Sequence, residues 1–134
     1  MRLRVLLFHA TRFACRPEAP ASAAAEAASP REWGECMAVF AAAQAGDETR
    51  LASIADTLAA WAVDLGVGEV VLHSFAHLFC ADPLNASAAR QVLEELAREL
   101  GWRGLRVGAT PFGWRNAWEL AVLGHPRAKA ALEL

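Results

Sequence analysis

The sequence has no tyrosine and a single lysine, Lys129, although 13 of its 134 residues are basic. Arginine supplies all the other basic residues, and the formal net charge is -2. A negative balance argues against a nucleic-acid binder that relies on a strong positive field. It leaves open an RNA substrate that another domain delivers.

Cysteine is scarce, and no apolar run approaches the ~20 residues of a membrane helix. Cys15, Cys36 and Cys80 are widely spaced and form no Cys-x-x-Cys pair, a usage typical of free thiols in a reducing compartment. We therefore expect a soluble, cytoplasmic protein without a membrane partner. A chain of this length and of 55% hydrophobic content is the size of one domain, residues 1–134.

Common site signatures are absent as well. The sequence contains no GxGxxG, no phosphate loop, no GxSxG and no HExxH. Its four histidines form no cluster with cysteine of the kind that binds zinc, because His77 and Cys80 alone fall short of four ligands. We expect no metal and no cofactor.

Hydrophobic periodicity predicts a mixed α/β fold in which two main helices pack on a β-sheet. The predicted elements are strands 4–8 and 35–43, a helix 47–65 capped by Asp47, a strand 69–74, a helix from Asn85 or Ser87 to Gly101, and strands 105–111 and 114–124. For residues 35–43 a buried helix remains the alternative. Residues 15–31 are expected to form a loop or mobile excursion, with an Ala-rich turn of helix within it as the alternative. Phe112-Gly113 is expected to form a tight hairpin, and the ending RAKAALEL the start of a linker helix or a tag remnant.

Two histidines flank the end of the third predicted strand, in VLHSFAHLFC. A buried imidazole bonded to backbone is the plainer interpretation of either one. The carboxyl end of a strand is nevertheless where α/β proteins place ligands. His77 is therefore the best titratable candidate for acid–base work near neutral pH.

A second candidate segment is WRNAWEL at 114–120. Trp114 and Trp118 project to one face of a strand and offer a stacking platform for a base, although core packing is the competing role. On the opposite face, Arg115 and Glu119 are spaced to form a solvated ion pair.

Four motifs occur together in order: RVLLFHA at 4–10, HSFAHL at 73–78, GATPFGW at 108–114 and GHPRA at 124–128. In this order and spacing the chain resembles the N-terminal editing domain of archaeal threonyl-tRNA synthetase, which is related in fold to the D-aminoacyl-tRNA deacylases. The resemblance covers about residues 2–130.

The resemblance implies a deacylase of the D-aminoacyl-tRNA deacylase-like fold that hydrolyses L-seryl-tRNA(Thr) and spares L-threonyl-tRNA(Thr), without metal or cofactor. The partners implied are the tRNA(Thr) 3′ end carrying serine, the remainder of the synthetase in the same chain or a separate subunit, and a second copy in a homodimer.

The resemblance also implies a site with much main-chain contact. Matched position by position, its substrate-binding residues are Ala42, Ala43, Gln44, Phe75, Ala76, Pro111, Phe112, Gly113, Arg115 and Lys129, and the side chains expected to assist catalysis are His77 and Asn116. His77 would orient the nucleotide or water, and Asn116 would hydrogen-bond the substrate. Small residues allow close approach of substrate to backbone.

This chain departs from the family pattern at two positions. The usual site lysine aligns with Asn116, and the usual glutamate aligns with Lys129. Asn116 carries no charge, and Arg115 stays protonated, so neither can act as a base. An exchange of partners that brings Lys129 to the same spot is one geometric possibility. Two hypotheses follow: an active deacylase that relies on backbone groups, water and the tRNA 2′-hydroxyl, or a silent module for tRNA-end binding or dimerisation. A D-aminoacyl-tRNA deacylase is a third.

Overall fold

The computed structural model describes residues 3–23, 25–75, 78 and 84–134. Its elements are β1 (Arg4–Pro20), β2 (Arg31–Trp33), β3 (Cys36–Ala42), the 3-10 turn η1 (Asp47–Thr49), α1 (Leu51–Leu65), β4 (Glu69–Ser74), α2 (Ala86–Trp102), β5 (Arg106–Ala109), β6 (Trp114–Val122) and β7 (Lys129–Glu133). The predicted mixed sheet with two main helices is confirmed, and residues 35–43 form a strand rather than a helix.

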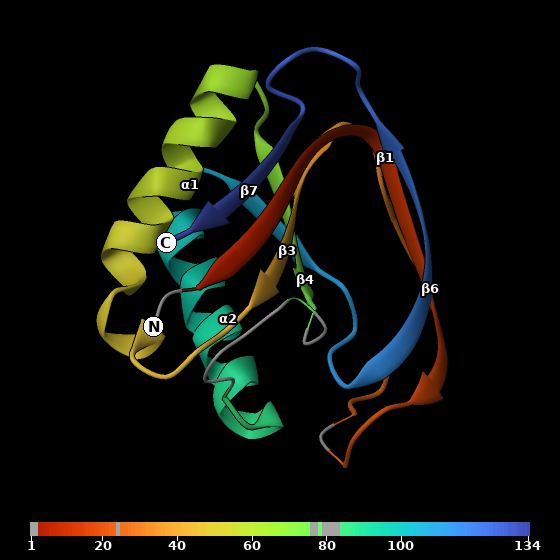
Figure 1. Cartoon of the computed structure of the whole chain (residues 1–134). Helices are drawn as coiled ribbons and strands as arrows, with labels where there is room; N and C mark the ends of the chain where they lie inside the picture. The colour runs from red at the N-terminus through yellow and green to blue at the C-terminus, as the bar shows by residue number, and fades with distance from the viewer. Residues whose placement is uncertain (1–2, 24, 76–77, 79–83) are drawn as a thin grey trace.

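The strands form one sheet in the order β2-β1-β3-β4-β5, and β6 and β7 both pair with β1 (Figure 1). β3, β4 and β5 run parallel to one another, whereas every described pairing of β1 is antiparallel. Parallel neighbours need a crossover, and α1 and α2 supply the two crossovers.

Strand β1 is much longer than its predicted core of 4–8, and the loop predicted from Cys15 is wrong as far as Pro20. The first half of β1 pairs with β3 and β7, and the second half pairs with β2 and β6. A register shift between Ala10 and Arg12 marks the change of partner. Pro17 is tolerated because β2 reaches only to Cys15, so β1 pairs there with β6 alone.

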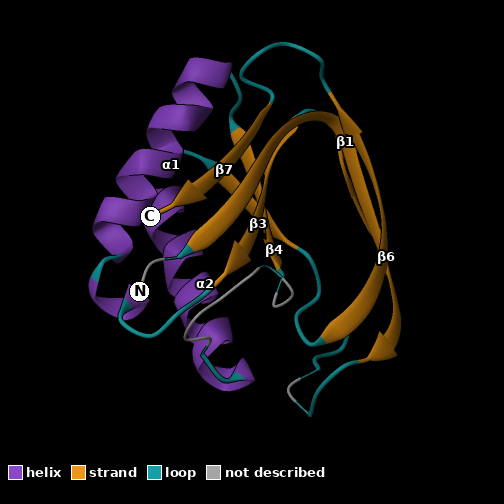
Figure 2. Cartoon of the chain, in the orientation of Figure 1, coloured by secondary structure: helices purple, strands orange, loops and turns teal. Residues whose placement is uncertain are grey.

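Both helices cover one face of the sheet (Figure 2). Each helix buries one stripe against the sheet: Ile54, Ala55, Leu58 and Ala62 in α1, and Val92, Leu93, Leu96 and Leu100 in α2. Gly66 ends α1 with φ 73°, and the Asn85 side chain caps α2 by accepting from the Ala88 amide at 2.9 Å. Neither described helix has an apolar stretch long enough to cross a bilayer.

The predicted cap of the first helix is wrong. Asp47 begins η1, and α1 starts at Leu51 after Arg50, without a side-chain cap. The chain turns at Gly46, where φ is 95°, so the carboxylate of Asp47 faces back toward Gln44 instead of along the helix.

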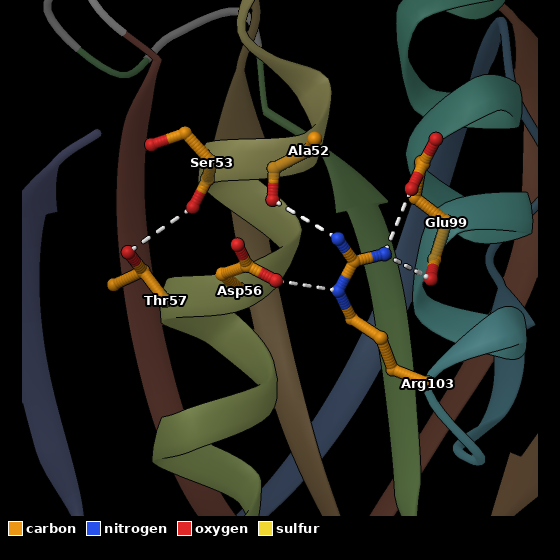
Figure 3. Close-up of polar contacts among 6 residues, drawn as sticks. All are labelled: Ala52, Ser53, Asp56, Thr57, Glu99 and Arg103. Carbon is orange, nitrogen blue, oxygen red and sulfur yellow. Dashed lines mark hydrogen bonds and ion pairs between the residues drawn. The ribbon is translucent and has the colours of Figure 1, made fainter.

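Arg103, just beyond α2, ties the two helices together (Figure 3). Its guanidinium donates to Asp56 at 2.8 Å and to the Ala52 carbonyl at 3.3 Å in α1, and to the Glu99 carboxylate at 2.7 Å in α2. One planar fork of donors thus fixes the separation of the two helices at this end.

A second apolar cluster covers the face of the sheet away from the helices. Its buried members are Ala10, Phe13, Cys15, Trp33, Cys36, Ala38, Phe40 and Val71. Trp33 reaches across this face from β2 to β5, where Gly108 leaves room for its indole. Alternate residues of the strands therefore serve two separate cores.

Two predictions about the C-terminal third are wrong. Phe112-Gly113 does not join a hairpin, because β5 pairs with β4 whereas β6 pairs with β1. The ending is not a linker helix: Lys129–Glu133 forms β7, whose residues pair with Arg4–Phe8.

Adding a methyl group at Gly108 should destabilise the fold, because the new Cβ would lie 2.9 Å from Cε2 of Trp33. Overpacking of this kind costs about 1–3 kcal/mol. We expect Gly108→Ala to lower the free energy of unfolding by that amount in urea denaturation. Gly34→Ala is the matched control, because its added Cβ meets no described atom within 4 Å. Equal effects of the two substitutions would contradict the placement of Trp33.

Candidate functional site

The structure brings three of the predicted segments to one edge of the sheet. β3, β4 and β5 are adjacent and parallel, so residues 42–44, residue 75 and residues 110–113 all follow the carboxyl ends of neighbouring strands. Phe75 donates from its amide to the Ala41 carbonyl at 2.9 Å, and Thr110 donates to the Leu72 carbonyl at 3.0 Å. This edge is where open α/β sheets bind ligands. Ala76 and His77 lie outside the described residues.

Residues 42–44, which form the wall of the candidate site after β3, are held in place by a buried carboxylate. Asp47 is fully buried and its Oδ2 accepts from the Gln44 amide at 2.6 Å, while Arg50 pairs with its other oxygen. Burial raises the pKa of Asp47, opposed by the bond from Gln44 and the charge of Arg50. Ala43 accepts from the Leu84 amide at 3.2 Å. The backbone of this wall is therefore fixed by groups on both sides of it.

The wall after β5 is a turn stabilised by Asn116. Its Nδ2 donates to the Pro111 carbonyl at 3.1 Å and lies 3.4 Å from the Trp114 carbonyl. Gly113 takes φ 81°, which favours glycine, and accepts from the Ala21 amide at 2.7 Å. Asn116 Oδ1 is buried and has no hydrogen-bond partner among the described residues. A buried acceptor without a donor costs about 1–3 kcal/mol.

His73 lies beneath the same turn. Its Nδ1 is 2.8 Å from the Thr110 hydroxyl, and its ring lies 4.8 Å from the ring of Phe40. Burial lowers the pKa of His73 to about 4, so the imidazole is neutral near pH 7. His73 is a buried histidine, as the plainer interpretation expected, but its hydrogen-bond partner is the Thr110 side chain and not the backbone.

Arg115 and Lys129 lie elsewhere on the sheet. Arg115 is exposed on β6 opposite Ala19, and Glu119 pairs with Arg12 at 2.8 Å rather than with Arg115. Lys129 is opposite Phe8, whereas Asn116 is opposite Pro17, about 30 Å further along β1 at ~3.3 Å per residue. The structure does not bring Lys129 next to Asn116.

Sequence reasoning missed two supporting residues. Asp47 looked like a helix cap, and its separation of three residues from Gln44 fits the tight turn that the structure shows. Nothing in the sequence pattern indicated a role for Thr110, because its partner His73 lies 37 residues away on another strand. The described residues include no group of three or more His, Cys, Asp or Glu that could hold a metal ion.

The chain is similar in sequence to known proteins. Residues 3–134 match the archaea-specific editing domain of threonyl-tRNA synthetase. The threonine–tRNA ligase of Methanopyrus kandleri is 34% identical over 131 residues, and that of Methanoculleus marisnigri 32% over 130 residues. Each match covers 92% of this chain and 21% of the ligase, so the chain spans about a fifth of these relatives.

Solved structures share the fold at low identity. A probable eukaryotic D-amino acid tRNA deacylase superposes with a TM-score of 0.73 at 12% identity and full coverage of both chains. A c-Myc DNA unwinding element binding protein gives 0.72 at 10% identity, covering 98% of each chain. The predicted deacylase-like fold is confirmed.

The pKa of His73 predicts a loss of stability in acid. An unfolded histidine titrates near pH 6.5, so stability from the neutral folded form is present above that pH and is lost as pH falls toward 4. We expect the free energy of unfolding of the wild type, measured in urea, to fall by on the order of 3 kcal/mol more than that of His73→Phe as the pH is lowered through this window. Thr110→Val, which keeps the buried imidazole, should retain the wild-type slope. Equal slopes for wild type and His73→Phe would contradict this account.

Proposed function

The chain belongs to the archaea-specific editing domains of threonyl-tRNA synthetase, and from this premise we propose that it hydrolyses L-seryl-tRNA(Thr) and spares L-threonyl-tRNA(Thr). The whole enzyme would need such a site, because a pocket made for threonine gains only ~1–3 kcal/mol from the methyl group that serine lacks. A second site that admits serine and excludes that methyl group supplies the remaining discrimination.

The observation that carries the proposal is the meeting of residues 42–44, residue 75 and residues 111–113 at one sheet edge. Ala42, Ala43 and Gly113 let a substrate approach the main chain closely. Backbone amides held rigidly by the fold are effective at stabilising the negative charge of a tetrahedral intermediate. The rigid walls of this edge support a site of that kind.

In the proposed reaction, a water molecule attacks the ester carbonyl carbon. The new bond joins the water oxygen to this carbon, the bond to the tRNA 3′-oxygen breaks, and a proton passes to the departing oxygen with help from the 2′-hydroxyl. Asn116 holds the Pro111 carbonyl through Nδ2, and its Oδ1 accepts from the serine ammonium or hydroxyl. His77 orients the nucleotide or the water. Lys129 has no part in this scheme.

A silent module is the second candidate, and a specific observation favours it. Asn116 and Lys129 occupy the positions where the resemblance implies a lysine and a glutamate. If those charges are essential, the domain would only hold the tRNA 3′ end or a second copy of itself. Hydrolysis of D-aminoacyl esters is the third candidate, supported by the shared fold alone.

The deciding experiment is deacylation of four esters by the purified domain: L-seryl-, L-threonyl-, D-seryl- and D-threonyl-tRNA(Thr). We expect kcat/KM for L-seryl-tRNA to exceed that for L-threonyl-tRNA by about 10- to 200-fold, the range that one methyl group provides. If none of the four esters is hydrolysed above the uncatalysed rate, the domain is the silent module. A preference for the D-esters would establish the third candidate.

Removing the amide of Asn116 should weaken the site without abolishing it. Asn116→Ala deletes the bond to the Pro111 carbonyl and the buried acceptor, and one hydrogen bond contributes about 0.5–1.5 kcal/mol. We expect kcat/KM for L-seryl-tRNA to fall about three- to tenfold. Gln91→Ala is the control, since Gln91 is an exposed amide on α2 that bonds only Glu95 at 3.1 Å among the described residues. A loss of a thousandfold or more in Asn116→Ala would instead identify Asn116 as the source of catalysis.

A further inference from the structure

Two histidines hold the β6–β7 segment, residues 123–128, against β1. His9 of β1 is buried, and its Nδ1 lies 2.8 Å from Nε2 of exposed His125 in this segment. On the other side of the same ring, His9 Nε2 lies 2.8 Å from the Glu35 carboxylate. His125 Nδ1 in turn accepts from the Arg127 amide at 3.2 Å. Four groups thus form one continuous chain of hydrogen bonds that uses every ring nitrogen of both histidines.

The direction of each bond in this chain follows from its two ends. A backbone amide can only donate, so His125 Nδ1 carries no hydrogen. A neutral His125 therefore carries its hydrogen on Nε2 and donates it to His9 Nδ1. His9 then carries its own hydrogen on Nε2 and donates it to the Glu35 carboxylate. The chain is complete when both imidazoles are neutral and both are Nε2–H tautomers.

A proton added to either ring breaks this chain. On His125 Nδ1 it faces the N–H of Arg127. On His9 Nδ1 it faces the hydrogen of His125 Nε2, unless that hydrogen moves to His125 Nδ1 and displaces the Arg127 amide. With one added proton on each ring, both facing nitrogens carry hydrogen, and two cations cannot keep a contact of 2.8 Å. Histidine is the side chain that ordinarily changes charge between about pH 5 and 8.

Other ionisable groups lie on each element around the pair: Glu35 and Cys36 at the start of β3, Asp64 on α1, Glu69 on β4, Arg127 in the segment and Lys129 on β7. Arg127 pairs with Asp64 at 3.2 Å and lies 4.7 Å from the centre of the Trp61 ring. Glu69 pairs with Arg106 at 3.9 Å. The charges of these two pairs are therefore balanced.

Glu35 acts on the pair by direct contact. Burial raises the pKa of Cys36 to about 11, helped by the charges of Glu69 and Glu35, so this thiol stays neutral. Lys129 is opposite Phe8, so its side chain lies on the other face of the sheet from His9. Glu35 is ionised near neutral pH and touches His9, so its charge favours a protonated ring.

We propose that this chain is a proton-operated clasp, which holds the β6–β7 segment to β1 while both imidazoles are neutral and lets it open when they are protonated. Two backbone bonds flank the clasp: the Leu123 amide donates to the His9 carbonyl at 2.9 Å, and the His9 amide donates to the Ala128 carbonyl at 2.8 Å. Opening would loosen the place where β1 changes its partner from β7 to β6. The closed form binds fewer protons than the open form, so closure weakens as pH falls. The inference does not depend on the proposed function.

The tautomers are tested by two-bond nitrogen–proton correlation spectra of the ¹⁵N-labelled protein near pH 8, where histidine is ordinarily neutral. We expect His9 and His125 each to carry hydrogen on Nε2. A predominant Nδ1–H tautomer in either ring would overturn the inference.

Amide hydrogen exchange, corrected for the intrinsic rate at each pH, tests the clasp itself. The protection of the Leu123, Arg127 and Ala128 amides should fall about two- to tenfold for each hydrogen bond lost as pH is lowered from about 8 to about 5.5. The amides of β3 report global unfolding and serve as the reference. Unchanged protection of the segment, or an equal fall in β3, contradicts the clasp.

Two substitutions and a control connect this pH profile to the two rings. In His125→Gln the carboxamide can donate to a neutral His9 or accept from a protonated one, so protection should become nearly independent of pH. Glu35→Gln keeps an acceptor for His9 but removes the negative charge, so the fall should move to lower pH. His73→Phe is the control, because His73 bonds Thr110 and not the segment, and it should keep the wild-type profile. A wild-type profile in either of the first two variants, or its loss in His73→Phe, would refute the proposal.

Discussion

The long pairing of β1 is the constraint on which the rest of the structure depends. Four other strands, β2, β3, β6 and β7, form hydrogen bonds with this one strand. Its first half completes the sheet that the helices cover, and its second half carries β6. β6 begins directly after the Pro111–Gly113 turn, and its first residue pairs with Pro20. The last residues of β1 therefore determine where that turn lies relative to the parallel strand ends.

The candidate site consists of main-chain segments that buried polar side chains hold in place. Asp47 bonds the Gln44 amide, His73 bonds Thr110 just before the turn, and Asn116 bonds the Pro111 carbonyl. Each anchor is a hydrogen bond made in partial or full burial, where breaking it would leave a polar group unsatisfied. A hydrogen bond of this kind needs a donor but no charge. Asn116 makes this bond without carrying a charge.

The sequence correctly predicted the helices and strands that bury one periodic face. It missed strands whose pairing partners are distant in the sequence. The stripes of α1 and α2 and the strands at 36–42 and 69–74 follow from local pattern, because burial on one face imposes a period. β7 and the end of β1 were missed because their stability comes from partners more than 90 residues away. The order of motifs pointed to segments that the structure brings to one sheet edge, whereas the contacts of Asp47 and Thr110 are not encoded by spacing. The roles of all the candidate site residues stay predictions, and Ala76 and His77 also lie outside the described residues.

The most direct test of the central claim is a crystal structure with a non-hydrolysable amide analogue of 3′-seryl-adenosine. The account predicts that the seryl carbonyl lies within hydrogen-bond distance of main-chain amides in residues 42–44 or 111–113, with Asn116 Oδ1 accepting from the seryl group. An analogue bound away from the edge formed by β3, β4 and β5, or a carbonyl contacted only by charged side chains, would contradict it.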